Sequence, residues 1–269
     1  MVARHCAVLG SPIGHSLSPV LHRAAYAHLG LDWTYDAHEV DEAGLRPFVE
    51  RLDDSWRGLS LTMPLKRAAL IVADRVSPLA REVGAANTLV IEDDGTRSAH
   101  NTDVPGMVAA IRKQAGPLLL SACVWGGGAT AASVLAALRT LRVERIHLHA
   151  RQPHRAVATL SVATSLGLDV ATKPWCPDEQ CAAAGLIVST TPAGATDGVA
   201  AELADSARPG RVLFDVVYDP WPTDLARAWA KEGGAVASGL DLLVHQAVGQ
   251  LQLMTGRDVP AEVLYSALS

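Results

Sequence analysis

The fold of this chain is decided by one stretch of sequence, residues 121–151, which reads SACVWGGGATAASVLAALRTLRVERIHLHAR. A short apolar segment leads into a glycine-rich turn, a helical segment rich in alanine and leucine, and a second apolar segment that ends in arginine. This order predicts strand, turn, helix and strand, the half-unit that binds a dinucleotide. Gly126 permits the tight turn, Gly128 lets the backbone approach a pyrophosphate, and the small Ala131 allows the helix to pack on the strand.

The end of the second strand indicates which dinucleotide binds. Arg151 stands there, with His154 and Arg155 close behind. An acidic side chain would accept a hydrogen bond from a free ribose 2'-hydroxyl, whereas a guanidinium pairs with a 2'-phosphate. We therefore expect NADP(H) rather than NAD(H), with its phosphates held by the amides of the turn and the N-terminus of the following helix.

Composition excludes several classes of protein. The chain has 269 residues, of which 49% are hydrophobic and 19% charged, which predicts a soluble globular protein of one large or two modest domains. A net charge of -5 argues against nucleic acid as a general partner, so an anionic substrate would need a local pocket of donors. The apolar run at the N-terminus is too short for a signal segment or a membrane span, which predicts a cytoplasmic location.

Cysteine spacing gives no sign of a metal site. Cys6, Cys123, Cys176 and Cys181 form no CxxC pair and stand in no paired spacing with histidine. We therefore expect reduced thiols, no disulfide and no metal.

Residues before 103 alternate between apolar and helical segments. We expect strands at 4–10, 31–40, 58–63 and 88–93, and helices at 18–30, 42–52 and 78–83. Ser18 precedes Pro19 and is expected to cap its helix, while Pro64 is expected to open a helix with Lys66 on the first turn. Asp103 stands before the next helix, where it is either an N-cap or a functional carboxylate.

The alternation resumes after the glycine-rich unit. We expect a helix near 154–166, strands near 168–172, 186–190 and 212–217, and helical stretches from Gly239 to the end. The fold class is thus α/β with two domains: residues 1–103, completed by helices in residues 239–269, and a doubly wound parallel-sheet (Rossmann) domain of residues 104–238. The active site is expected in a cleft between them.

Eight short segments occur in a particular order: SPIGHSLSP (11–19), LTMPLK (61–66), GAANT (84–88), NTD (101–103), GGGATA (126–131), ARQPHR (150–155), DVVYDPWPT (215–223) and GLDLLVHQ (239–246). Each is ordinary alone, but together they resemble the shikimate dehydrogenases over nearly the whole chain. The resemblance implies an NADPH-dependent, reversible reduction of 3-dehydroshikimate to shikimate, a small anionic substrate, in the biosynthesis of chorismate and the aromatic amino acids.

The resemblance also implies roles for individual residues. Lys66 and Asp103 match the family's catalytic pair. Substrate-binding positions are Ser16, Ser18, Ser60, Thr62, Asn87, Tyr218 and Gln246, of which the first two would hold the substrate carboxylate. Cofactor positions are Gly126, Gly127, Gly128, Ala129, Thr130, Ala131, Ala150, Arg151, Arg155, Thr191, Val216 and Gly239, the last two beside the nicotinamide.

The expected chemistry suits a lysine. Negative charge grows on the carbonyl oxygen as hydride arrives, and a positioned ammonium both stabilises that charge and delivers a proton. Which of Lys66 and Asp103 carries the proton stays open at this point. The chain departs from the family pattern at Ser60 and Ala150, where asparagine is common, and its turn reads GGGAT in place of a GAGGA type.

Three other readings remain. A quinate or quinate/shikimate dehydrogenase would more often use NAD and carry an acid where this chain has Arg151. An aminoshikimate dehydrogenase stays open. A non-catalytic NADP(H)-binding sensor would need the glycine-rich turn but not the pair Lys66 and Asp103. A homodimer is among the oligomeric states that the sequence allows.

Overall fold

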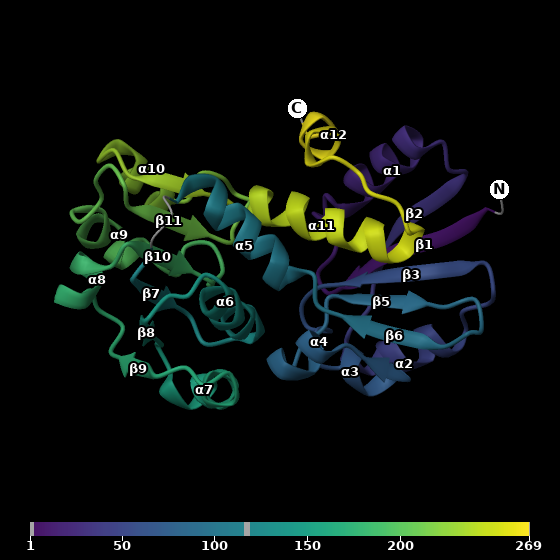
Figure 1. Cartoon of the computed structure of the whole chain (residues 1–269), viewed down its shortest axis with the longest axis horizontal. Helices are drawn as coiled ribbons and strands as arrows, with labels where there is room; N and C mark the ends of the chain where they lie inside the picture. Colours follow the sequence, from purple (N-terminus) through teal and green to yellow (C-terminus); the bar gives the residue numbers. More distant parts are fainter. Residues whose placement is uncertain (1–2, 116–118, 269) are drawn as a thin grey trace. The chain divides into compact units, whose positions relative to one another are not determined.

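The computed structural model describes residues 3–115 and 119–268. The chain divides into two compact units, one formed by Met1–Asp103 with Leu243–Ser269 and the other by Val104–Leu242. Each unit contains its own six-stranded sheet with helices on both faces (Figure 1). The predicted α/β fold is confirmed.

The sheet of the first unit is mixed, in the order β2-β1-β3-β5-β6-β4. Its strands are β1 (Arg4–Gly10), β2 (Trp33–Glu39), β3 (Trp56–Leu61), β4 (Arg75–Val76), β5 (Thr88–Ile91) and β6 (Arg97–His100). β3 is parallel to β1, whereas β5 is antiparallel to both β3 and β6. One edge of the sheet therefore holds the end of β3, the start of β5 and the end of β6. This topology brings Thr62, Asn87 and Asp103 to the same edge.

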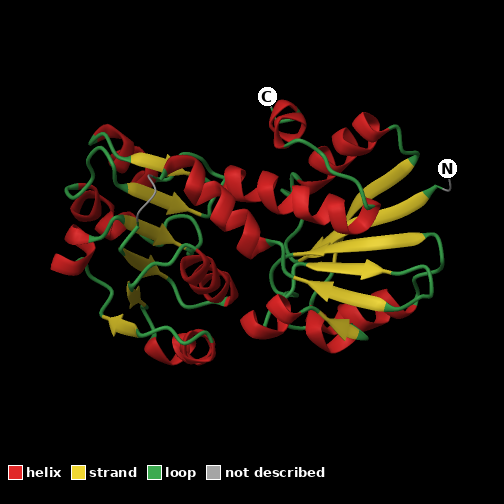
Figure 2. Cartoon of the chain, viewed as in Figure 1, coloured by secondary structure: helices red, strands yellow, loops and turns green. Residues whose placement is uncertain are grey.

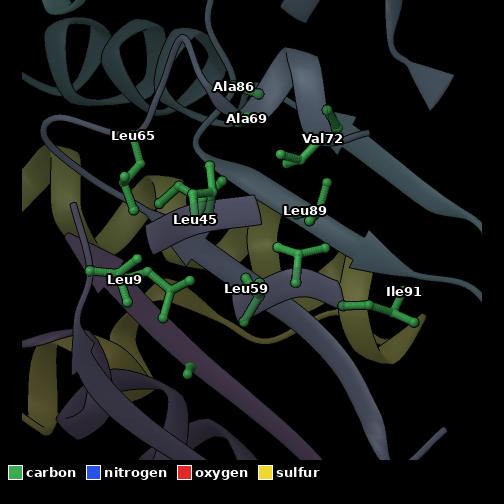
Figure 3. Close-up of a cluster of buried hydrophobic side chains, with 14 of the residues drawn as sticks. Leu9, Leu45, Leu59, Leu65, Ala69, Val72, Ala86, Leu89 and Ile91 are labelled. Atoms are coloured by element: carbon green, nitrogen blue, oxygen red, sulfur yellow. The ribbon is translucent and has the colours of Figure 1, made fainter. Parts of the chain in front are cut away.

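Two helical layers cover this sheet (Figure 2). One contains α2 (Glu42–Glu50), α3 (Ala69–Val72) and α4 (Pro78–Val83); the other contains α1 (Ser18–Leu29), the later turns of α11 (Gly239–Thr255) and α12 (Ala261–Ser266). Alternate residues of β1 serve the two layers, because Leu9 packs with the first and Val8 with the second. Figure 3 shows the first of these cores, in which Leu9, Leu45 and Leu59 meet.

Two local predictions are wrong. Ser18 does not cap α1: it is the first residue of the helix, Leu17 takes the N-cap position, and the Ser18 amide donates to Ser16 Oγ at 3.3 Å. Pro64 does not open a helix, because residues 63–68 form turns and α3 begins at Ala69. The Lys66 carbonyl accepts the Ala86 amide at 2.7 Å, so it is not available to a continuing helix.

The sheet of the second unit is entirely parallel, in the order β12-β11-β10-β7-β8-β9. Its strands are β7 (Ser121–Trp125), β8 (Arg145–His149), β9 (Val170–Lys173), β10 (Leu186–Ser189), β11 (Val212–Asp215) and β12 (Ala235–Ala237). The chain starts at β7, runs outward to β9, and returns to the other side of β7 at β10. This is the strand order of a doubly wound dinucleotide-binding sheet, and it confirms the predicted Rossmann fold.

The helices of the second unit connect these strands. They are α5 (Asp103–Gln114), which leads in from the first unit, α6 (Ala129–Thr140), α7 (Pro153–Ser165), α8 (Glu179–Ala183), α9 (Asp197–Ala204) and α10 (Asp224–Lys231). Side chains of α8, α9 and α10 share one hydrophobic core with Cys123 and Trp125 of β7. The short elements β4, α8, α9, α10 and β12 were not predicted. In the part of the chain that the structure describes, no helix has the length and apolar character needed to span a bilayer.

Candidate active site

Lys66 and Asp103 form an ion pair at the edge where β3 and β6 end. Lys66 Nζ lies 2.7 Å from Asp103 Oδ2, and the two side chains are 18% and 6% exposed. The turn after β3 positions the lysine, and the first residue of α5 supplies the carboxylate. An ammonium has three N–H donors, so two remain for a ligand after the bond to Asp103.

Asn87 orients the carboxylate of Asp103. The Thr102 backbone N–H, which can only donate, lies 2.8 Å from Asn87 Oδ1 and so identifies that atom as oxygen. The amide nitrogen of Asn87 must then face the other way, where it lies 2.9 Å from Asp103 Oδ1. Both oxygens of Asp103 are therefore held, one by Lys66 and one by Asn87.

Gln246 joins this group from α11. It is buried, and its Oε1 lies 3.2 Å from the Asn87 side-chain nitrogen, while its own Nε2 donates to the Leu243 carbonyl at 2.9 Å. The structure thus connects four residues named from the sequence, Lys66, Asn87, Asp103 and Gln246, by hydrogen bonds.

Ser60 is held by a second, buried set of polar groups. Tyr35 donates to Ser60 Oγ at 2.6 Å, and Ser60 donates to Gln250 Oε1 at 2.8 Å. Gln250 Nε2 in turn donates to the Asn87 carbonyl at 3.1 Å. Ser60 donates its only hydroxyl hydrogen to Gln250. A substrate hydroxyl could accept a hydrogen bond from Ser60 only if that bond were broken.

His22 completes this buried set. Its ring stacks on Tyr35 at 4.0 Å between centroids, and its Nε2 lies 3.2 Å from Gln250 Oε1. An amide oxygen only accepts, so Nε2 carries the hydrogen. Complete burial lowers the pKa of His22 to about 3, and the ring is neutral at physiological pH.

The remaining residues expected to bind substrate lie in two places. Ser16 and Ser18 begin α1, and Thr62 follows β3, where its amide donates to the Leu9 carbonyl at 3.0 Å. Ser18 is buried, and its backbone N–H donates to Ser16 Oγ. Tyr218 belongs to the second unit, in the loop after β11, where burial raises the pKa of its phenol.

The glycine-rich turn after β7 fits a dinucleotide pyrophosphate. Gly126 has φ +116, and a Cβ there would lie 2.3 Å from Thr190 Oγ1; a Cβ on Gly127 would lie 2.9 Å from that of Ala156. A Cβ on Gly128 would meet nothing within 4 Å, which leaves open space beside the N-terminus of α6. Among the described residues no side chain caps that helix, so the amides of residues 129–131 are free for a phosphate.

Arg151 lies at the end of β8 and is exposed, as a 2'-phosphate ligand requires. Its guanidinium carbon is 5.5 Å from the ring centroid of Trp175, which packs edge-on against Trp125 at 4.9 Å. The ring of Trp175 therefore stabilises the guanidinium of Arg151 by a cation–π contact. Ala150 is buried, and the side chain of Arg155 lies outside the described part of the structure.

The predicted nicotinamide positions lie together. A Cβ on Gly239 would be 2.2 Å from the carbonyl oxygen of Val216, so only glycine allows α11 to begin against the loop after β11. Thr191 follows β10 at the switch point, where its hydroxyl lies 3.3 Å from that of Ser189. Val216 and Thr191 follow the carboxyl ends of β11 and β10, the end of a parallel sheet at which ligands bind.

Known proteins show the same sequence pattern and fold. Residues 8–89 match the family model described as shikimate dehydrogenase substrate binding domain, and residues 239–268 match that of the shikimate 5'-dehydrogenase C-terminal domain. A shikimate dehydrogenase (NADP(+)) of Thermus thermophilus is 36% identical over 251 residues, covering 93% of this chain and 92% of the relative. The chain belongs to the shikimate dehydrogenase family. The resemblance predicted from the eight segments is confirmed.

Solved shikimate dehydrogenases have the same fold. The crystal structure of Mycobacterium tuberculosis shikimate dehydrogenase is 42% identical and superposes with a TM-score of 0.89, covering 98% of each chain. A Thermus thermophilus shikimate 5-dehydrogenase, solved in complex with NADP(H) and shikimate, is 33% identical with a TM-score of 0.85, again covering 98% of each chain.

Sequence reasoning missed the residues of this shikimate dehydrogenase family member that hold the others in place. These are Thr102 beside Asn87, Gln250, Tyr35 and His22 around Ser60, and Trp175 under Arg151. Thr159 was also missed; its hydroxyl donates to the carbonyl of Gly127 at 2.8 Å and ties α7 to the glycine turn. Thr102 stands next to Asp103 in the NTD segment, which was the one available signal.

Proposed function

We propose that this protein is an NADP(H)-dependent shikimate dehydrogenase that reduces 3-dehydroshikimate to shikimate and catalyses the reverse oxidation. The observation that carries the proposal is the ion pair of Lys66 and Asp103, 2.7 Å apart and held by Asn87. It occurs in a chain whose relatives along almost its full length are named shikimate dehydrogenase (NADP(+)).

Lys66 is the proton donor in this proposal. NADPH supplies the hydride that reaches the carbonyl carbon. Lys66 donates an N–H to the carbonyl oxygen, stabilises the negative charge that develops there, and passes a proton to it, so that C=O becomes CH–OH. In the oxidation direction the amine takes the proton back.

Asp103 positions this donor. Its Oδ2 accepts from Lys66, and its Oδ1 accepts from Asn87, so neither carboxylate oxygen can rotate without breaking a bond. A carboxylate oxygen has more than one lone pair, and each retains capacity for a substrate hydroxyl. We assign Asn87 and Gln246 to ring hydroxyls, and Ser16 and Ser18 to the substrate carboxylate.

The second unit binds the cofactor. The open N-terminus of α6 and the Gly128 backbone would hold the pyrophosphate, and Arg151 would pair with the 2'-phosphate. Arg151 is the residue that favours NADP(H) over NAD(H), because its guanidinium pairs with a 2'-phosphate but forms no ion pair with a neutral 2'-hydroxyl.

The test is a set of initial rates with purified protein, with shikimate or quinate as substrate and NADP+ or NAD+ as cofactor. We expect the highest kcat/KM with shikimate and NADP+. A higher kcat/KM with quinate and NAD+ would replace the assignment by a quinate dehydrogenase. Tight NADP(H) binding without turnover of shikimate would favour a sensor instead. The cytoplasmic location and a homodimeric state stay predictions.

A further inference from the structure

Four side chains that the proposed reaction does not use converge inside the second unit. They are Cys123 at the centre of β7, His149 at the end of β8, and Asp178 and Cys181 at the start of α8. One ligand atom from each lies within 4.8 Å of every other. Cys123, His149 and Cys181 are buried, and Asp178 is half-buried. Around a tetrahedral zinc ion, ligand atoms lie about 3.5 Å apart, so shifts of about an ångström would complete such a shell.

The fold places these residues on one face of the sheet. β7 and β8 are parallel, with Cys123 opposite His147 and Trp125 opposite His149. Residues two apart on a strand share a face, so Cys123 and His149 are diagonal neighbours. The layer above them contains α8, whose residue Cys181 packs in the same core as Cys123.

His149 is oriented as a metal ligand. Its Nδ1 lies 2.7 Å from the Pro174 carbonyl, which can only accept, so Nδ1 carries the hydrogen. In the neutral ring Nε2 then presents a lone pair, and that atom lies 3.2 Å from Cys181 Sγ. A backbone carbonyl on the outer nitrogen is the usual support of a metal-bound histidine. Stacking on Trp125 at 4.4 Å and 5° fixes the plane of the ring.

A buried cation beside the cluster matches the charge of a zinc site. Arg211 is 4% exposed and donates to the carbonyls of Cys181, Ala182 and Ala184 at 2.7, 2.9 and 2.6 Å. Its guanidinium hydrogen bonds go to backbone carbonyls, and no carboxylate of the described residues pairs with it. Two thiolates and a carboxylate around a divalent ion leave one negative charge, and two cations lie beside it: Arg211, and Lys173, whose Nζ is 3.9 Å from Asp178 Oδ2.

We propose that the second unit holds a structural zinc ion bound by Cys123, His149, Asp178 and Cys181. The donor set of two thiolates, one imidazole and one carboxylate suits zinc in tetrahedral geometry. The ion would link the strand that leads into the glycine turn to the strand that ends before Arg151. This role is structural and is independent of the proposed reaction.

The experiment measures metal content of the full chain, purified under reducing conditions and exposed to zinc before metal-free gel filtration. We expect one equivalent of zinc in the wild type and none in Cys181→Ser or His149→Gln, each checked for folding by circular dichroism. Cys176→Ser is the matched control, because Cys176 is an exposed thiol outside the cluster, and it should keep its zinc.

Cobalt gives a second readout that needs no variant. Binding of Co2+ to the reduced wild type should produce a thiolate-to-cobalt charge-transfer band and the intense visible bands of a tetrahedral ion. Zinc that is absent from the wild type, or retained equally in Cys181→Ser, would overturn the proposal. A disulfide between Cys123 and Cys181, found by mass spectrometry together with no metal uptake after reduction, would also overturn it.

Discussion

The two units prepare for ligands in different ways. In the first unit the candidate site consists of side chains already hydrogen-bonded to one another, from Tyr35 through Ser60 and Gln250 to the Asn87 backbone. In the second unit the candidate pyrophosphate site is formed by the backbone of the glycine turn. Space is open there, because a Cβ added at Gly128 would meet nothing within 4 Å. The substrate site is therefore ordered by side-chain contacts, whereas the pyrophosphate site is open because its turn carries no side chain at Gly128.

Replacing Lys66 should break the first site most severely. Lys66→Ala removes the proton donor and should lower kcat for shikimate by about 10² to 10⁴, with a smaller change in KM. Steady-state kinetics at saturating NADP+ measures both. Lys231→Ala, an exposed lysine of α10, is the control and should behave as wild type.

Replacing Arg151 tests the one side chain on which the second site depends. Arg151→Asp puts a negative charge where a 2'-phosphate would lie, and should raise KM for NADP+ by about 10- to 100-fold, the worth of a charged hydrogen bond. KM for NAD+ should fall or stay unchanged. Arg145→Asp makes the same charge change at the other end of β8. If Arg151→Asp and Arg145→Asp both keep the wild-type preference for NADP+, Arg151 does not bind the 2'-phosphate.

Acid should weaken the first unit through His22. Its pKa is lowered by burial to about 3, against an ordinary value of 6.5, so the unfolded chain binds a proton between these values and the folded chain does not. The free energy of unfolding should therefore decrease as pH falls below 6.5, by about 2 kcal/mol at pH 5 from this residue.

Urea unfolding at pH 7.5 and pH 5 measures this loss. His22→Gln should show a smaller loss than the wild type, whereas His15→Gln, at an exposed position, should match the wild type. An equal loss in all three proteins would show that His22 is not the group responsible.

Substitutions at Gly126 and Gly128 should affect different properties, the first protein stability and the second cofactor binding. Gly126→Ala forces a side chain onto φ +116 and into Thr190, and should destabilise the protein by about 1–3 kcal/mol. Gly128→Ala meets no protein atom within 4 Å and should fold normally, but its methyl group should raise KM for NADP+ about tenfold through an overpacking cost of about 1–3 kcal/mol. Thermal melts and cofactor titrations of both variants measure the contrast, which fails if Gly128→Ala binds NADP+ as the wild type does.

The comparison also explains what the sequence could predict. The glycine turn, its helix and Arg151 are consecutive in the chain, and local rules of turn and helix chemistry were enough to identify them. Ser60 and Gln250 are 190 residues apart, and only the packing of α11 on the first sheet brings them together. No spacing rule anticipates such a contact.

The cysteine cluster was missed for the same reason. Its residues come from β7, β8 and the short helix α8, which was not predicted, so their intervals match no metal motif. The errors at Ser18 and Lys66 are different. At Ser18 the helix start was right and only the cap was wrong, because Leu17 takes the N-cap position. At Pro64 the helix start was wrong, because the Lys66 carbonyl accepts the Ala86 amide in a turn.

The central claim is that an ammonium at position 66 delivers the proton, and chemical restoration of that group tests it most directly. In a Cys176→Ser background the other cysteines are buried, so a thiol introduced by Lys66→Cys can be aminoethylated to restore an amine of similar reach. Shikimate oxidation with NADP+ should fall by about 10² to 10⁴ in Lys66→Cys and largely return after aminoethylation. Turnover by unmodified Lys66→Cys within about twofold of its parent would contradict the account.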